Sequence, residues 1–192
     1  MPLNSFAGLA EHIRGLPLSA GAARIVAIDG CGGAGKSTFA EALSAELGGC
    51  SIVHTDDFAS WDQPLDWWPR LLDQVLIPLS RSEPACYQRY DWDAKELVDW
   101  LSVESETVIL EGVSSTRREF RPFLAYRVWI ETPAELRLER GLDRDGTAME
   151  GQWLRWMADE DRYMADHLPR ASADLIVDGS VAPIGGQFTV LQ

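Results

Sequence analysis

Lysine is almost absent from this sequence. The chain has 192 residues and 17 Lys and Arg side chains, but only Lys36 and Lys95 are lysines. Asp and Glu number 30, so the formal net charge is −13 at pH 7. An acidic surface repels the phosphate backbone, which argues against a nucleic-acid partner. An anionic ligand would need a local group of cations to overcome this overall charge.

Cysteines and long apolar runs are also scarce. The three cysteines, Cys31, Cys50 and Cys86, have neither paired nor metal-type spacing, which is typical of a reducing compartment and predicts a cytoplasmic protein. No stretch approaches the roughly 18 apolar residues of a membrane span, so no membrane partner is expected. Residues 1–23 carry charges among their apolar residues, unlike a signal peptide.

Short apolar strands alternate with helical segments along the chain. This order predicts right-handed βαβ crossovers and a mainly parallel five-stranded sheet between helices, in a three-layer α/β/α sandwich. No linker divides the chain, and its length predicts one domain over residues 1–192. Strands are predicted at 24–29, 51–54, 106–111, 126–131 and 174–178, and helices at 4–15, 36–47, 66–77, 133–143 and 150–167.

A glycine-rich loop follows the first predicted strand directly and leads into a helix. It fits the phosphate-loop pattern G-x-x-x-x-G-K-[ST]. Glycines allow backbone N–H groups to converge on an anion, and the positive end of the helix dipole points to the same place. A glycine-rich turn with a chance lysine is the alternative. The pattern predicts an ATP cradle of the P-loop NTPase fold, made by Gly30, Gly32, Gly33, Ala34, Gly35, Lys36, Ser37 and Thr38.

Acidic residues follow two of the buried strands. Asp56 comes after strand 51–54, and Glu111 ends strand 106–111. Ligands of open parallel sheets bind beyond the carboxyl ends of the strands. Asp56 is therefore predicted to accept a proton from an attacking hydroxyl, and Ser37, Glu111 and Asp56 to hold Mg²⁺. A helix cap or a solvated surface acid is the alternative for each acid.

Three arginines recur along the helix predicted at 133–143 and at its end. Arg137, Arg140 and Arg144 follow the spacing i, i+3, i+7, which places them on one helical face. Such a group can neutralise a phosphoryl group during lid closure. We predict a lid over about residues 137–150, with Arg137 binding the nucleotide and Arg140 and Arg144 acting in catalysis. Surface ion pairs with neighbouring acids are the alternative.

Taken in order, these motifs resemble the uridine kinase/phosphoribulokinase family of P-loop kinases, over about residues 24–178. The similar segments are the phosphate loop, Thr55–Phe58, Tyr90–Trp92, Glu111-Gly112, the lid arginines and Ala173–Val177. The resemblance implies ATP and Mg²⁺ as cofactors, a hairpin around Tyr90–Trp92, and Asp56 as the catalytic acid-base group. Lys36 would act with the lid arginines on the transferring phosphoryl group.

The acceptor side departs from that family. Trp61-Asp62-Gln63-Pro64 lies only six residues after Asp56, and Asp93 stands where the family has a base-binding histidine. The acceptor is therefore predicted to be a small-molecule hydroxyl, nucleoside or polyol, bound within about residues 56–104. Five of the eight tryptophans fall between residues 61 and 100 and could equally fill a hydrophobic subdomain. The candidate acceptor residues are Asp62, Asp66, Tyr90, Asp91 and Trp92.

Two other functions stay open. An ATP-binding regulatory protein without acceptor turnover would explain the altered acceptor motifs. A nucleoside monophosphate kinase shares the fold but needs more acceptor-side arginines than residues 56–100 contain. The oligomeric state also stays open, with a homodimer as one candidate.

Overall fold

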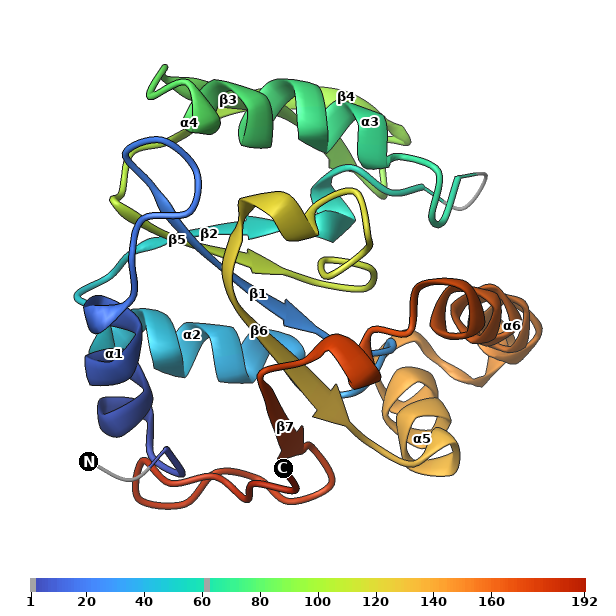
Figure 1. Cartoon of the computed structure of the whole chain (residues 1–192). Coiled ribbons are helices and arrows are strands. Elements are labelled where there is room, and N and C mark those ends of the chain that lie inside the picture. Colours follow the sequence, from blue (N-terminus) through green and yellow to red (C-terminus); the bar gives the residue numbers. More distant parts are fainter. Residues whose placement is uncertain (1–2, 61–62) are drawn as a thin grey trace.

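A computed structural model describes residues 3–60 and 63–192 of the chain. At its centre, five strands form a sheet in the order β2-β5-β1-β6-β7 (Figure 1). All pairings in this sheet are parallel, so the carboxyl ends of the strands lie at one edge. Every predicted strand is confirmed. The strands are β1 (Arg24–Asp29), β2 (Ser51–His54), β5 (Thr107–Glu111), β6 (Leu124–Glu131) and β7 (Leu175–Asp178).

Helices α1 (Phe6–Gly15) and α2 (Lys36–Glu46) cover one face of the sheet. The side chains of Ile13 and Leu43 pack there against Val26 and Ile28 of β1. Helix α1 begins later than predicted because Ser5 is its cap, with a side chain that accepts from the Gly8 N–H at 3.2 Å. The apolar stripes of both helices bury one side of the central strand.

The opposite face is covered by one helical stretch and a hairpin. The stretch comprises α3 (Trp68–Leu71), a π-turn (Leu72–Leu76) and α4 (Ile77–Ser80). The predicted helix 66–77 thus begins two residues too early and ends three residues too early, and Pro78 lies inside the continuation. Proline cannot donate to the carbonyl one turn earlier, and the wide turn before it accommodates that loss. The hairpin pairs β3 (Ala85–Asp91) with β4 (Glu96–Val103), as the family resemblance implied.

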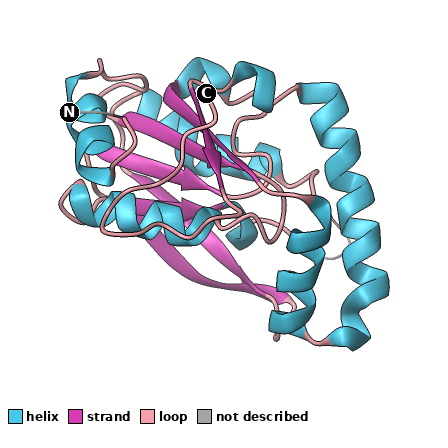
Figure 2. Cartoon of the chain, turned by 90° about the horizontal axis from the view of Figure 1, so that it is seen from below, coloured by secondary structure: helices cyan, strands magenta, loops and turns pink. Residues whose placement is uncertain are grey.

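Helices α5 (Ala134–Asp145) and α6 (Glu150–His167) lie side by side at the carboxyl edge of the sheet (Figures 1 and 2). They pack closely, because a Cβ atom on Gly141 would lie 2.4 Å from the Trp153 ring. These two helices contain the predicted lid. Short 3₁₀ turns occur at Thr55–Asp57, Arg121–Phe123, Thr147–Met149 and Arg170–Ser172.

The last residues of the chain pair with β7. The Asp178 N–H donates to the Thr189 carbonyl at 2.9 Å, and the Leu191 N–H donates to the Ile176 carbonyl at 2.8 Å. The Phe188 ring enters the core on the α1–α2 side of the sheet. Residues 188–192 are thereby fixed at the sheet edge.

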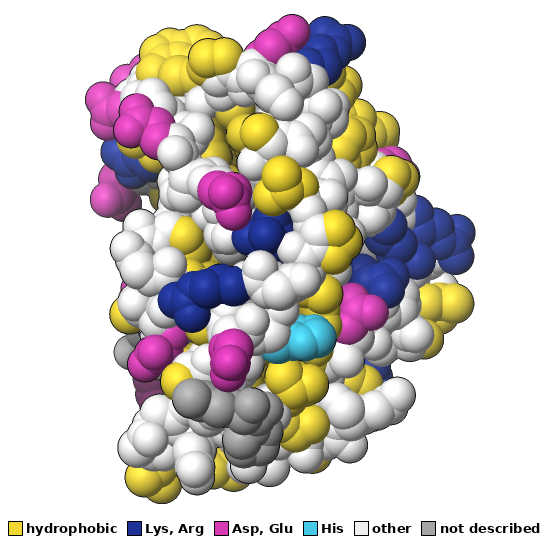
Figure 3. Space-filling view, turned by 60° about the vertical axis from the view of Figure 1, so that its left-hand side comes forward, with side chains coloured by type: hydrophobic (Ala, Val, Ile, Leu, Met, Phe, Trp, Pro, Cys, Tyr) yellow, Lys and Arg dark blue, Asp and Glu magenta, His cyan; other side chains and the backbone are white. Residues whose placement is uncertain are grey.

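The surface carries mixed charge. On the face seen in Figure 3, basic side chains lie among acidic ones. Within the described residues, no helix is both long and apolar enough to span a membrane.

Candidate active site

A cleft of about 800 Å³ opens at the carboxyl edge of the sheet. The phosphate loop forms its floor, strand ends and the hairpin form one wall, and α5 and α6 form another. Most of the predicted site residues meet there. They are Gly32, Gly33, Ala34, Gly35, Lys36, Ser37, Thr38, Asp56, Trp92, Glu111, Arg140 and Arg144.

The loop needs glycine at two positions for different reasons. Gly33 has a φ of +74°, and a Cβ atom there would lie 2.5 Å from the Arg137 carbonyl oxygen. Helix α5 therefore sits directly on the loop. Gly35 has a φ of +95°, but a Cβ atom there would meet nothing within 4 Å, so the backbone is open to the cleft. Within the described part of the chain, the N–H groups of Gly33 and Gly35 donate to no protein acceptor.

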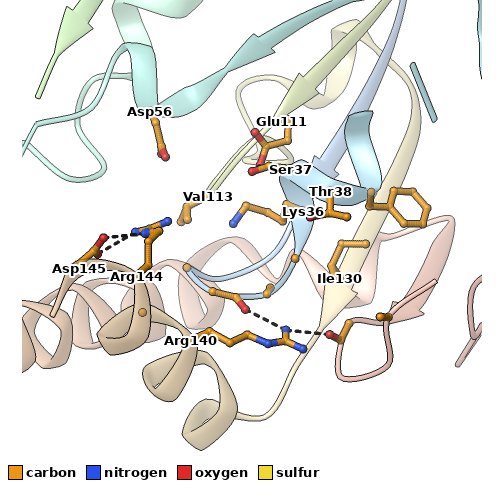
Figure 4. Close-up of a pocket in the computed structure, with 18 of the residues that line it drawn as sticks. Lys36, Ser37, Thr38, Asp56, Glu111, Val113, Ile130, Arg140, Arg144 and Asp145 are labelled. Carbon is orange, nitrogen blue, oxygen red and sulfur yellow. Dashed lines mark hydrogen bonds and ion pairs between the residues drawn. The ribbon is translucent and has the colours of Figure 1, made fainter. Parts of the chain in front are cut away.

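Lys36 and Ser37 begin helix α2, and Glu111 lies beside Ser37 (Figure 4). The Lys36 ammonium donates to the Cys31 carbonyl at 3.0 Å, and the Ser37 hydroxyl donates to Glu111 Oε1 at 3.2 Å. His54 Nδ1 lies 2.6 Å from Glu111 Oε2. Burial would raise the pKa of the Glu111 carboxyl, but His54 and Lys36 outweigh it and hold that pKa below its usual value. Glu111 is therefore a fixed anion beside Ser37.

Cys31 lies within the loop, but its thiol is buried. Burial and the nearby charge of Glu160 raise its pKa far above the usual value, so the thiol stays protonated and unreactive.

Asp56 points into the cleft from the wall opposite the loop (Figure 4). The Asp56 side chain is accessible from the cleft, but the protein atoms that line the cleft exclude part of the water around the carboxyl group. This partial dehydration raises the pKa of the Asp56 carboxyl, while the charge of Lys36 opposes the shift. The Trp92 indole donates to the Asp56 backbone carbonyl at 3.1 Å and so fixes the turn that carries the acid.

The arginines of the predicted lid separate into two groups. Arg140 donates to the carbonyls of Gly33 at 3.2 Å and Gly179 at 2.9 Å, and so ties the phosphate loop to the residue after β7. Arg144 lines the cleft and pairs with Asp145. Arg137 does not line the cleft, although it shares their helical face. Its guanidinium is buried beneath the loop.

The predicted acceptor residues are only partly at the cleft. Trp92 lines it, and Tyr90 stacks edge-on against Trp92 at a centroid distance of 5.7 Å. Asp91 instead accepts from the N–H groups of Asp93 and Ala94, which is a turn-forming role. Asp66 is exposed and outside the cleft lining. Trp61 and Asp62 lie outside the described residues.

Several residues at the site were not predicted from the sequence. Asp93, Met149, Trp153 and Trp156 line the cleft. Asp29 and Glu160 are buried against the loop. Asp29 could have been found by the argument used for Glu111, because it too ends an apolar strand.

The donors present suit Mg²⁺ and a nucleotide. Ser37 and Glu111 offer hard oxygen atoms, and Mg²⁺ sites of this type take their remaining ligands from phosphates and water. Accordingly, the described residues contain no group of three or more His, Cys, Asp or Glu side chains that could hold a metal alone. The free amides of Gly33 and Gly35 suit phosphate oxygens.

A parallel sheet, a glycine loop with free amides and the helix that follows it define a P-loop NTPase fold. Among sequence families, the model described as AAA domain matches residues 26–179. The chain belongs to this AAA domain family. No curated protein sequence matches the chain.

Solved structures agree with this fold. A protein from Bacillus stearothermophilus described as a possible uridine kinase has a TM-score of 0.69 and 23% identity, over 90% of this chain and 97% of its own. A candidate fructose transport system kinase from Silicibacter sp. TM1040 has a TM-score of 0.67 and 20% identity, over 90% of this chain and 98% of its own. The resemblance drawn from the motifs is thus confirmed at the level of the fold.

Proposed function

We propose that the chain is a small-molecule kinase that transfers the γ-phosphoryl group of ATP to a hydroxyl of a neutral acceptor. The observation that carries the proposal is the placement of Asp56. Its carboxylate enters the cleft from the wall opposite Lys36 and the phosphate loop. A proton acceptor facing a phosphate cradle across an accessible cleft is the arrangement that hydroxyl phosphorylation needs.

On the nucleotide side, the loop supplies the amides of Gly33 and Gly35 and the Lys36 ammonium. Ser37 and Glu111 would hold Mg²⁺, which neutralises phosphate charge when it is bound. The Glu111 carboxylate is kept ionised and oriented by His54. Arg144 adds a cation on the lid side of the same space.

On the acceptor side, Asp56 orients the hydroxyl and accepts its proton. The raised pKa of its carboxyl makes it a stronger base than an aspartate in water. Trp92 and Trp156 form an aromatic wall of the cleft against which a flat or apolar face can pack.

Two of the three arginines of the acceptor region, Arg70 and Arg89, support a neutral acceptor. Arg70 donates to the carbonyls of Gln88 and Asp57. Arg89 pairs with Asp99 at 3.3 Å, and beyond the region Arg117 pairs with Glu119 at 3.0 Å. These guanidinium groups are already engaged, which disfavours a phosphorylated acceptor such as a nucleoside monophosphate. The two solved relatives, described as uridine and fructose transport system kinases, add nucleosides and sugars to the acceptors to test.

The test is a coupled ADP-release screen over nucleosides, sugars, polyols and nucleoside monophosphates, with Mg²⁺ and ATP. We expect saturable turnover with a neutral acceptor. Lys36→Ala should reduce kcat/KM by about 100- to 1,000-fold, since it removes a preorganised cation. The matched control is Lys95→Ala, which removes the other lysine, an exposed one in the hairpin turn, and should leave turnover unchanged.

Two results would overturn the proposal. Turnover only with nucleoside monophosphates would favour that class of kinase. ATP binding with no acceptor-dependent ADP release would favour a regulatory protein.

A further inference from the structure

Glu160 of α6 reaches the phosphate loop and is buried there, with 1% of its surface exposed. Its Oε1 accepts from the Gly32 backbone N–H at 2.6 Å and from the Trp156 indole at 2.9 Å. Its Oε2 accepts from the Arg137 guanidinium at 2.9 Å. One carboxylate therefore joins the loop, the aromatic wall and α5.

This contact completes a regular pattern in the loop. The N–H of Gly30 donates to the Asp29 side chain at 2.7 Å, and the N–H of Ala34 donates to the Cys31 carbonyl at 3.1 Å. With Gly32 bonded to Glu160, alternate amides point to protein acceptors. The intervening amide of Gly33, like that of Gly35, stays free for an anion.

The bond to Glu160 fixes the peptide plane between Cys31 and Gly32. Each peptide plane restricts the next, because only two backbone dihedrals separate them. Anchoring the Gly32 amide therefore narrows the directions that the Gly33 amide can take.

We propose that Glu160 is a positioning residue, which holds the phosphate loop in the shape that accepts nucleotide phosphates and links it to the cleft wall at Trp156. This inference rests on the proposed ATP cradle but not on acceptor turnover. The buried Arg137–Glu160 pair could instead serve stability alone, so the test must separate the two roles. Removing one partner of a buried pair is strongly destabilising, and both are therefore replaced together.

The experiment compares two double variants, Glu160→Gln with Arg137→Met, and Glu160→Met with Arg137→Met. Both lack the ion pair and keep similar side-chain volume. Only the first keeps an oxygen that can accept from the Gly32 N–H. Equilibrium binding is measured for two probes, the Mg²⁺ complex of β,γ-imido ATP and adenosine, which has no phosphates. The matched control is Asp161→Asn, an exposed carboxylate on the same helix.

We expect the Glu160→Met double variant to bind β,γ-imido ATP about tenfold more weakly than the Glu160→Gln double variant, because the Gly32 N–H then lacks its acceptor. Adenosine should bind both alike, and Asp161→Asn should match the unmodified protein with both probes. Equal β,γ-imido ATP affinities of the two double variants would overturn the proposal. An equal loss for both probes would do the same, because it would indicate a general structural defect.

A second measurement uses the unmodified protein without nucleotide. Hydrogen exchange followed by NMR should show the Gly32 amide at least about tenfold slower than the Gly33 and Gly35 amides. Equal exchange rates would contradict the proposed anchoring, even if neither double variant folds. If the protein binds β,γ-imido ATP but phosphorylates no acceptor, the proposed kinase activity is wrong. The proposed role of Glu160 would still stand. If the unmodified protein does not bind β,γ-imido ATP, both proposals fail.

Discussion

Asp29 is a fully buried carboxylate that organises three segments of the chain. It accepts from the backbone N–H groups of Ser114 at 3.0 Å and Thr116 at 2.9 Å, beyond the end of β5. It also accepts from the Tyr163 hydroxyl of α6 at 2.6 Å and the Gly30 amide of the phosphate loop. Hydrogen bonds to an ionised acceptor are about twice as strong as neutral ones. This single residue thus fixes the loop, the segment after β5 and helix α6 together.

Tyr163→Phe tests that arrangement. The change removes one charge-assisted hydrogen bond and leaves the ring in place, so the free energy of unfolding should fall by about 2 kcal/mol. Denaturant unfolding measures this. Tyr126→Phe, at another largely buried tyrosine whose hydroxyl does not bond to Asp29, is the control. If Tyr163→Phe lowers the free energy of unfolding no more than Tyr126→Phe does, the role given to Asp29 is wrong.

The pH dependence of turnover tests Asp56. Its carboxyl must be ionised to accept a proton, and dehydration raises its pKa. A raised pKa means that the acid stays protonated to a higher pH than usual. Activity should therefore fall as the pH drops through a value above the ordinary aspartate pKa of about 3.9. A profile of kcat/KM against pH measures this, and Asp56→Asn should lack that acidic limb and have far lower activity. If kcat/KM instead falls only at the ordinary aspartate pKa, the cleft does not raise the pKa of Asp56.

Residues differed in how well the sequence predicted them. The phosphate loop was placed residue by residue, because its fixed spacing determines a local backbone shape. The burial of Arg137 was not predicted, because helical spacing shows which side chains share one face of a helix but not what covers that face. Glu160 could not be assigned to the loop, because Gly32 lies 128 residues away in the sequence and no local pattern records such a contact.

At the scale of elements, the packing of α5 on α6 depends on a missing side chain. Gly141→Ala would place a Cβ atom 2.4 Å from the Trp153 ring. A glycine-to-alanine change in a helix usually stabilises by up to about 1 kcal/mol. Here overpacking should reverse the sign and destabilise by about 1–3 kcal/mol. Thermal unfolding measures this change.

Gly151→Ala is the matched control in α6. A Cβ atom there would meet nothing within 4 Å, so the change should be neutral or stabilising. If the two alanine variants have the same melting temperature, the close contact between α5 and α6 is not present in solution.

Strand β4 of the hairpin could not be predicted from the sequence pattern. Strand β4 is exposed along most of its length, including Leu97 and Trp100. A strand with little buried surface lacks the apolar alternation by which strands are recognised. The hairpin was expected only from the resemblance of Tyr90–Trp92 to a family motif. The five sheet strands, by contrast, are buried and read as apolar runs.

At the scale of the whole molecule, the two ends of the chain are joined across α2. The Phe6 N–H donates to the Gly186 carbonyl at 3.0 Å, and the Phe188 N–H donates to the Asn4 carbonyl at 3.0 Å. The rings of Phe6, Phe39 and Phe188 contact one another at centroid distances of 4.9, 5.0 and 5.1 Å. This cluster fixes the C-terminal segment, which also lines the cleft.

Phe188→Ala should therefore cost about 3 kcal/mol or more in the free energy of unfolding, since it leaves a cavity between two rings. Val190→Ala, at a partly exposed neighbour, should cost less than half as much. Denaturant unfolding of both variants checks the prediction. Equal losses would show that the aromatic cluster does not hold the end of the chain.

The engaged arginines of the acceptor region have a consequence for the end of the proposed reaction. A neutral acceptor leaves as a phosphate ester with up to two negative charges. Arg70 and Arg89 already have protein partners, and the protein as a whole carries a net charge of −13. The new ester would therefore gain little attraction on the acceptor side and be repelled by the overall field. Product should dissociate readily and inhibit weakly, and turnover would then be limited by earlier steps.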